Sequence, residues 1–298
     1  MNTCLRILTV PILILFTAFG SKASSEENTW HVAIELPGTT FISLEPIWLD
    51  ITLTNVSADT QRTAGLDGPN HRGFGIFLYD SRGDSVRHTG PQINFGGGPG
   101  RLLLEPGEQD YGSFDLTELF FSHEAKSGYS VGFWRFHYIP RGEYTVRAWY
   151  HGAVSNQLTF EIVEPHGEEV KALRLMEDAL RAWTPDGREP MALLYRQVVE
   201  RYPRSAFAEA SYYLSVLYSH WAEQKEGTWD KNILYRRMLE HCPNSGRSGS
   251  WIVALTHDKE DNERLAVINE LLEKHPNTRC YKYAEQLKKR ILKGTLGY

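Results

Sequence analysis

Eleven histidines and three cysteines are the side chains of this 298-residue chain best suited to bind a metal or to act as a base or nucleophile. None of them stands in a His-Glu-x-x-His, Cys-x-x-Cys or His-x-His pattern. His123, His137 and His151 could meet across strands, but single histidines at such spacings are more often surface or core residues. We therefore expect no catalytic residue, no metal ligand and no cofactor, and we expect that the chain is not an enzyme.

Two glycine-containing segments look like binding motifs but have simpler explanations. The adhesion-type tripeptide Arg82-Gly83-Asp84 also has ordinary hairpin-loop chemistry, because glycine adopts a positive φ without strain. The run Gly96-Gly97-Gly98-Pro99-Gly100 lacks the Lys-Ser/Thr pair that ends a phosphate-binding loop. A turn and a loop are the expected structures.

The densest aromatic stretch covers 129–138 and is expected to be a strand with rings on both faces. One face must serve the core, so the other either forms an exposed platform for a sugar or a protein, or is buried as well. The candidate binding surface consists of three residues of this stretch and two tyrosines of the second half: Trp134, Phe136, Tyr138, Tyr195 and Tyr235.

The N-terminal segment has the pattern of a secretion signal. Arg6 precedes an apolar run over 7–19, which is too short to span a bilayer comfortably. Residues 1–23 are expected to be a signal peptide that is cleaved after Ala23 or, alternatively, after Gly20; an uncleaved membrane anchor is the other interpretation. No later segment has the composition of a membrane span, so the mature chain is expected to be periplasmic or extracellular.

Removal of the signal leaves two cysteines, Cys242 and Cys280. An isolated pair in an oxidising compartment could form a disulfide, and both lie next to proline-containing turns. The spacing does not show whether the two Cα atoms come within reach, so a bridge and two half-buried thiols both remain open.

Charge is distributed unevenly along the chain. Residues 24–165 hold 9 Lys and Arg against 18 Asp and Glu, whereas residues 166–298 hold 21 against 19. Neither half offers a basic surface for a phosphate backbone, so nucleic acid is not expected as a partner.

The first half of the chain is composed of short apolar-alternating or β-branched runs separated by Gly, Pro and Asp turns. In the run that contains Leu49, Ile51 and Leu53, the apolar residues fall on one face, as in a half-buried strand. The expected strands are 30–36, 47–54, 74–79, 144–150 and 158–163. Many short strands and no helix-length pattern predict an antiparallel sandwich over 28–165.

Three segments of this half resemble the Ig-like sandwich domains of secreted bacterial proteins: Glu45-Pro46-Ile47-x-Leu49-x-Ile51-x-Leu53-x-Asn55, Leu104-x-Pro106-Gly107 and 140–148. Tyr144 follows a glycine-containing turn and begins a strand, which suits a tyrosine corner whose hydroxyl binds nearby backbone. The resemblance implies a fold and hardly any activity.

The second half, 166–298, contains a repeat. The segment 194–205 returns as 234–245 and again as 267–278. Each copy ends in a proline and, two residues later, a Ser or Thr. Proline ends the first helix of each copy, and Ser205, Ser245 and Thr278 can cap the second. One helical hairpin cannot bury its own apolar face, so neighbouring hairpins are expected to stack.

The residues Tyr202-Pro203-x-Ser205-x-x-Ala208-Glu209-Ala210-x-Tyr212-x-Leu214-x-x-x-Tyr218 resemble the tetratricopeptide repeat (TPR), most closely its version in exported bacterial proteins. Ser215 stands where the family usually has Gly, and the first interval of 40 residues exceeds the usual 34. The resemblance implies a concave groove that binds a peptide or a protein, and no ligand-binding residue is transferred by a motif.

These observations predict a multidomain β plus α chain, with an Ig-like sandwich followed by a TPR-like helical repeat. The expected function is an exported scaffold that binds a protein or peptide through the helical groove, the sandwich or their junction. The alternative is an exported carbohydrate-binding or protease-inhibiting accessory protein, or an enzyme without a recognised motif.

Overall fold

The computed structural model describes residues 29–63, 66, 73–89, 102–120, 130–131, 134–135, 139–182, 189–223 and 231–294. The expected signal peptide and its cleavage sites lie outside these residues, as do Gly96–Gly100, His123, Phe136, His137 and Tyr138. Among the helices in the described ranges, none is long and apolar enough to cross a bilayer.

The first half forms strands, as expected. Their bounds are β1 Trp30–Glu35, β2 Thr40–Ile42, β3 Trp48–Asn55, β4 Gln61–Thr63, β5 Phe74–Asp80, β6 Leu102–Leu104, β7 Gln109–Asp115, β8 Ser130–Val131, β9 Trp134–Arg135, β10 Gly142–Tyr150, β11 Ala153–Val154 and β12 Leu158–Val163, with a short helix α1 at Leu116–Leu119. A three-stranded sheet in the order β1-β3-β7 faces a second sheet built on β11-β10-β12-β2, in which β5 also pairs with β10. All five expected strands are confirmed.

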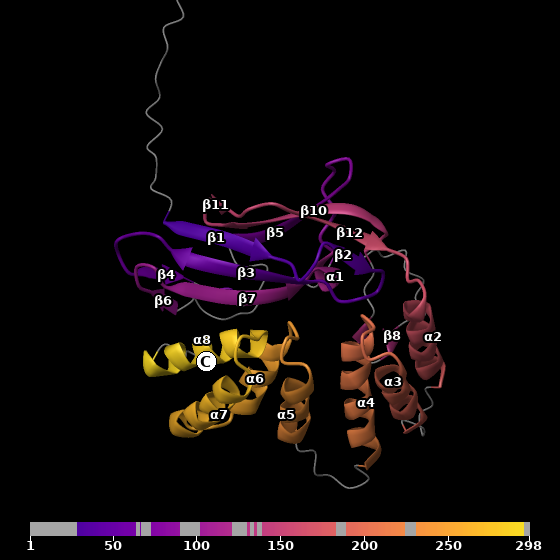
Figure 1. The fold of residues 1–298 in the computed structure, drawn as a ribbon. Helices are drawn as coiled ribbons and strands as arrows, with labels where there is room; N and C mark the ends of the chain where they lie inside the picture. The colour runs from indigo at the N-terminus through magenta and orange to yellow at the C-terminus, as the bar shows by residue number, and fades with distance from the viewer. Residues whose placement is uncertain are drawn as a thin grey trace, which may run out of the picture.

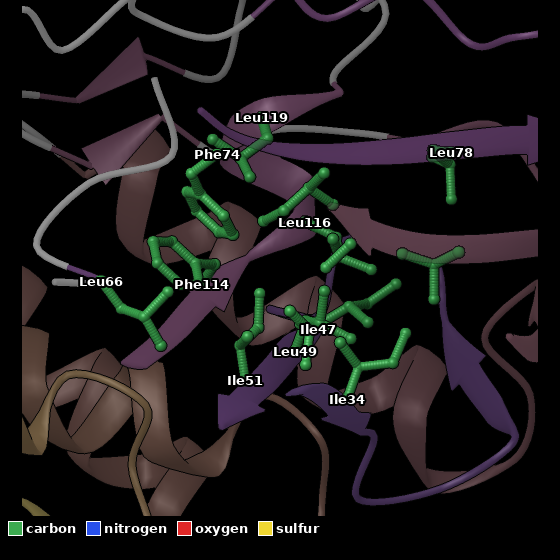
Figure 2. Packing of buried hydrophobic residues seen from close by; sticks show 14 of the residues in the cluster. Ile34, Ile47, Leu49, Ile51, Leu66, Phe74, Leu78, Phe114, Leu116 and Leu119 are labelled. Atoms are coloured by element: carbon green, nitrogen blue, oxygen red, sulfur yellow. The ribbon is translucent and has the colours of Figure 1, made fainter. Parts of the chain in front are cut away.

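The core of this half lies between the two sheets (Figure 2). Leu49, Ile51 and Leu53 of β3 all point into it and are fully buried, which confirms the alternation predicted from their spacing. Tyr144 at the start of β10 donates a hydrogen bond through its hydroxyl to the carbonyl oxygen of Pro140 at 2.7 Å, as expected for a tyrosine that ties down a corner.

Two features of the strands differ from the expectation. β12 pairs with β2 in a parallel direction, so the sandwich is not wholly antiparallel. The aromatic stretch is not one strand, because β8 and β9 pair antiparallel with each other and the chain reverses between Val131 and Trp134.

The second half is helical. Its elements are α2 Glu168–Arg181, α3 Glu189–Arg201, α4 Ala208–Glu223, α5 Lys231–His241, α6 Ser248–Thr256, α7 Asp261–Lys274 and α8 Arg279–Leu292. Neighbouring helices pack against one another, α3 on α4, α5 on α6 and α7 on α8, and their apolar faces form two clusters that share Tyr213 of α4. A chain of mixed β and α structure is thus confirmed.

The repeated proline turns have a repeated local geometry. The Oγ of Ser205 accepts a hydrogen bond from the N–H of Phe207 at 3.1 Å, and the Oγ of Ser245 accepts one from the N–H of Arg247 at 3.1 Å. Thr278 caps α8 through a bond from the N–H of Tyr281 at 3.2 Å. The predicted cap is therefore confirmed for Thr278, whereas Ser205 and Ser245 bind the backbone of the turn that leads into α4 and α6, and the residue that caps α6 is Arg247.

The helices form a third layer beneath the sheet of β1, β3 and β7 (Figure 1). α8 contacts β7, and the turn before α6 reaches β3, so this sheet is covered on both faces. Its inner face is mainly apolar, with Asp110 as a charged exception. Its outer face presents Trp48, Asp50, Tyr111, Ser113 and Asp115 to the helices, as the register of β3 on β7 requires. Polar residues on this face meet a protein surface rather than bulk water.

Candidate functional site

The junction between sheet and helices is closed along β3. Trp48 and Asp50 lie on the outer face of β3, and the turns before α6 and α8 approach them. The backbone at Gly246 packs so closely on the indole of Trp48 that a methyl group there would overlap the ring. The Nε of Arg279 donates to both carboxylate oxygens of Asp50 at 3.0 Å, and the Oγ of Ser113 donates to Oδ1 at 2.7 Å.

Buried carboxyl groups gather at one end of this contact. Glu45 and Glu209 line a small cavity of about 110 Å³ together with Trp48, Arg247 and residues of the first helical hairpin. Burial raises the pKa of Glu45 to about 7, and the charge of Glu169 adds to the rise. Burial also raises the pKa of Glu209, against the effect of a hydrogen bond from Ser245.

A larger cavity of about 610 Å³ lies where the junction opens, along β7. Five consecutive residues of β7, Tyr111–Asp115, border it on one side. The opposite wall comes from α6 and α8 and includes Ile252, Val253, Gln286 and Leu287. A half-open cavity of this volume with apolar walls and a few polar groups has the form of a ligand-binding site.

Asp115 is a buried carboxyl group that borders this cavity. Its Oδ1 accepts three hydrogen bonds, from the N–H of Ile47 at 3.2 Å and from the N–H and Oγ1 of Thr117 at 2.9 and 2.7 Å. Among the described residues no hydrogen bond reaches Oδ2. Burial raises the pKa of Asp115 to about 6, and the charge of Glu118 adds to the rise while Thr117 and Arg247 oppose it.

The other charged residues at the cavity are paired. The Nη2 of Arg247 lies 2.6 Å from Oε1 of Glu118, and the Nη2 of Arg290 lies 2.7 Å from Oδ1 of Asp110. Arg290 belongs to α8, and Asp110 lies on the inner face of the sheet, so the guanidinium must reach past the edge of β7. Among the described residues Asp115 has no ion pair of its own, although the nearby charge of Arg247 favours its ionised form.

Aromatic rings at the cavity already hold cations of this chain. The guanidinium carbon of Arg247 lies 5.6 Å from the centre of the Trp48 ring, and the Nζ of Lys282 lies 5.1 Å from the centre of the Tyr111 ring. Tyr111 also meets Tyr283 edge to face at 4.9 Å. One face of Trp48 and of Tyr111 is therefore occupied and not free to stack on a ligand.

The structure does not bring the predicted surface residues together. Tyr195 is fully buried between α3 and α4, where its ring stacks on that of Tyr218 with the ring centres 6.0 Å apart. The prediction that Tyr195 belongs to a binding surface is therefore wrong. α3 packs on both α2 and α4, which buries the face that carries this tyrosine. Tyr235 is half-buried against the second helical cluster, and the backbone of Trp134 lies in the hairpin of β8 and β9.

Cys242 and Cys280 are free thiols in the structure, so of the two open alternatives the disulfide is not formed. They lie in neighbouring proline turns, since the N–H of Cys280 donates to the carbonyl oxygen of Pro243 at 2.8 Å. Burial raises the pKa of each thiol to about 12. Both behave as apolar residues of the helical core.

Sequence reasoning missed Asp115, Arg247 and Arg290, because no motif connects positions this far apart. The alternation of β7 was the one available signal, since it places Asp115 on the face opposite Phe114. The sequence-based prediction also missed the Gly-x-Ser-x-Gly spacing centred on Ser130. That serine lies in the two-residue strand β8, which pairs with β9, and not in the strand-to-helix turn that exposes a nucleophile.

Other sequence motifs have structural roles. Gly83 has φ of +82° in the turn after β5, and the guanidinium of Arg82 pairs with Asp80 and Asp84, so the tripeptide forms a hairpin turn as expected. His151 is an exposed turn residue next to Tyr150. In the described ranges no three His, Cys, Asp or Glu side chains are grouped so that they could hold a metal ion.

No family model and no curated protein matches this chain. Among solved structures, it is similar to a β-glucosidase from Listeria innocua in complex with glucose, with 13% identity, a TM-score of 0.27, and coverage of 45% of this chain and 16% of the other. It is also similar to a polysaccharide lyase, with 8% identity, a TM-score of 0.19, and coverage of 89% and 37%. The chain thus spans well under half of either protein, and TM-scores this low carry no argument about fold or activity.

Proposed function

We propose that this chain is an exported interaction scaffold that holds a peptide or protein partner in the 610 Å³ cavity between β7 and helices α6 and α8. In this proposal the first half is an Ig-like sandwich and the second half a TPR-like repeat, joined into one unit. The observation that carries it is the cavity itself: a half-open groove with apolar walls and one uncompensated carboxyl group, built by both halves of the chain.

The fold assignments rest on local geometry. The corner bond of Tyr144 supports an Ig-like sandwich. The proline turns at Ser205, Ser245 and Thr278, in each of which the hydroxyl accepts a backbone hydrogen bond, support a TPR-like repeat. Export rests on the N-terminal sequence 1–23. The tight contact of Gly246 with Trp48 supports a fixed junction, because a groove between two halves binds well only if both walls keep their positions.

Two alternatives are weaker. A carbohydrate ligand would stack on aromatic faces, and cations of this chain already lie over Trp48 and Tyr111. An enzyme would need Asp115 as its acid or base, since the pKa of this group is raised to about 6, but three hydrogen bonds to Oδ1 fit a structural cap of α1 equally well.

A library of random linear peptides displayed on phage tests the proposal. Immobilised protein should enrich related sequences, and a Val253→Arg variant should not, because Val253 is 41% exposed and lines the cavity. Leu193→Arg is the matched control, since Leu193 is 49% exposed on α3 outside the cavity. Equal enrichment on wild type and Val253→Arg, with loss on Leu193→Arg, would move the site to the helical face and refute the cavity.

A further inference from the structure

The direction of the backbone groups of β7 follows from the other edge of the same sheet. Asn156 accepts from the N–H of Ile34 at 2.9 Å and donates to its carbonyl oxygen at 3.0 Å, so both groups of Ile34 point away from β3. Backbone groups alternate in an antiparallel ladder, so Ile51, which faces Ile34, directs its own groups toward β7. The bond from the N–H of Asn55 to the carbonyl oxygen of Glu108 fits this alternation.

Tyr111 and Ser113 therefore direct their N–H and C=O groups away from β3 and toward the cavity. Their neighbour Gly112 faces Ile51 and makes the ladder bonds. In the described part of the chain no strand pairs with this edge of β7. An unpaired edge is a template for another strand.

The cavity follows this edge over the length of five residues, Tyr111–Asp115. At about 3.4 Å per residue this is roughly 14 Å, enough for an extended segment of about five residues. Burial raises the pKa of Tyr283, and a hydrogen bond from the backbone of Ser113 opposes that rise. The N–H of Ser113 thus already binds the hydroxyl oxygen of Tyr283, and a carbonyl oxygen of an added strand would take the place of this hydroxyl.

Charge at the cavity favours a basic segment. The pairs of Arg247 with Glu118 and of Arg290 with Asp110 are internally neutral. Asp115 lies at the end of the same edge, with its hydrogen bonds confined to Oδ1. A Lys or Arg side chain or a terminal ammonium group at Oδ2 would supply the missing cation.

We propose that the cavity binds an extended segment of a partner protein, which adds to β7 as a strand through Tyr111 and Ser113 and places a basic group at Asp115. This inference rests on the proposed function, because it names the partner's chemistry at the same cavity. Main-chain hydrogen bonds supply the affinity of such strand addition, and pockets for alternate side chains supply its specificity.

Synthetic peptides made from the sequences that the phage library enriches, titrated against the full chain by calorimetry, test the inference. Methylation of peptide nitrogens should weaken binding at least tenfold at every second position and little at the others. Ser113→Pro should weaken it about tenfold, whereas Ser113→Ala should not, because only proline removes the N–H that binds Tyr283 in the free chain and would bind the added strand. This N–H faces away from β3, so its loss leaves the ladder with β3 intact. Asp115→Asn should lower the affinity about tenfold for peptides with a basic residue, and should leave it unchanged when norleucine replaces that residue.

Each other result has a distinct meaning. Enriched peptides that bind equally well to Ser113→Pro, or that lose affinity at every methylated position, overturn strand addition and leave the proposed function standing. Absence of enrichment over Val253→Arg overturns both. Self-association of the wild-type chain that Ser113→Pro abolishes, with no peptide binding, assigns the edge to a second copy and also overturns the proposal. Thermal melts and circular dichroism of each variant separate these results from misfolding.

Discussion

The two edges of the three-stranded sheet differ in what covers their free backbone groups. At the β1 edge, one side chain, Asn156, pairs with both backbone groups of Ile34 and so imitates a neighbouring strand. At the β7 edge, two helices that follow in sequence more than 130 residues later build walls around a cavity instead. A hollow of about 590 Å³ follows the β1 edge as well, but Asn156 occupies both backbone groups of Ile34 within it. At the β7 edge, the cavity is instead walled by two helices, and we propose that this edge serves a partner.

The largest loss of stability is expected at the ion pair that holds α8 against the β7 edge. Arg290→Met removes the partner of Asp110, whose side chain is fully buried, and should lower the free energy of unfolding by about 3–5 kcal/mol. Methionine keeps the helix propensity of α8, so the loss reports on the ion pair. Urea unfolding followed by tryptophan fluorescence measures it.

A matched exposed pair gives the control for this measurement. Arg236→Met breaks the ion pair of Arg236 with Glu270. Because the side chain of Arg236 is 45% exposed, the free energy of unfolding should fall by less than about 1 kcal/mol. Adding Asp110→Asn to Arg290→Met should recover part of the loss. Equal costs for Arg236→Met and Arg290→Met would show that the ion pair does not fix the wall of the cavity.

The next largest effect is expected at the closed part of the junction. A methyl group at Gly246 would overlap the ring of Trp48, so Gly246→Ala should lower the free energy of unfolding by about 3 kcal/mol. In Gly38→Ala the new Cβ would meet its nearest atom only at 4.0 Å, and this control should have almost no effect. Wild-type stability of Gly246→Ala in urea would mean that the two halves are not held by this contact.

The fold was largely predictable from the sequence and the junction was not. Alternation placed Leu49, Ile51 and Leu53 in the core, and the proline turns with Ser205, Ser245 and Thr278 marked three helix starts. Such signals are local, since they depend on residues a few positions apart. The pairs of Asp110 with Arg290 and of Asp50 with Arg279 join positions 180 and 229 residues apart, and no local pattern connects them.

Tyr195 is a residue whose exposure was predicted wrongly. Tyr195 and Tyr235 stand at equivalent positions of the repeat and were both predicted to lie on a binding surface, yet Tyr195 is buried and Tyr235 is only half-buried. The repeat predicts that two residues occupy equivalent positions on their helices. It does not predict how closely neighbouring helices pack on each position: α3 packs closely on both α2 and α4, whereas α5 packs mainly on α6 and touches α4 much less.

A third effect should appear as a dependence on pH. Asp115 keeps its proton up to about pH 6 in the folded chain, whereas in the unfolded chain it ionises near the ordinary aspartate pKa of 3.8. Between these values the unfolded state binds fewer protons, so this group makes stability fall as pH rises, by about 1–3 kcal/mol in all. Asp115→Asn retains an oxygen acceptor for Thr117 and should remove this component.

The measurement compares urea midpoints of wild type and Asp115→Asn from about pH 4 to about pH 7. The variant should gain stability relative to wild type as pH rises, whereas Asp59→Asn, which removes an exposed carboxyl group, serves as the control. A constant difference between wild type and Asp115→Asn across this range would mean that the carboxyl group is not buried at the β7 edge.

The smallest effect is expected at the β1 edge, where it tests the comparison most directly. Asn156→Ala removes both hydrogen bonds to Ile34, but water can reach this exposed position, so the cost should be only about 1 kcal/mol. The structural consequence is larger than the energetic one, because the variant leaves an unprotected edge that can pair with another chain. Sedimentation velocity should therefore show self-association of Asn156→Ala that is absent from wild type and from Gln157→Ala, which only breaks a bond to Arg147. A monomeric Asn156→Ala would mean that closure of the β1 edge does not depend on this amide, and the contrast with β7 would then lie in the walls of the cavity alone.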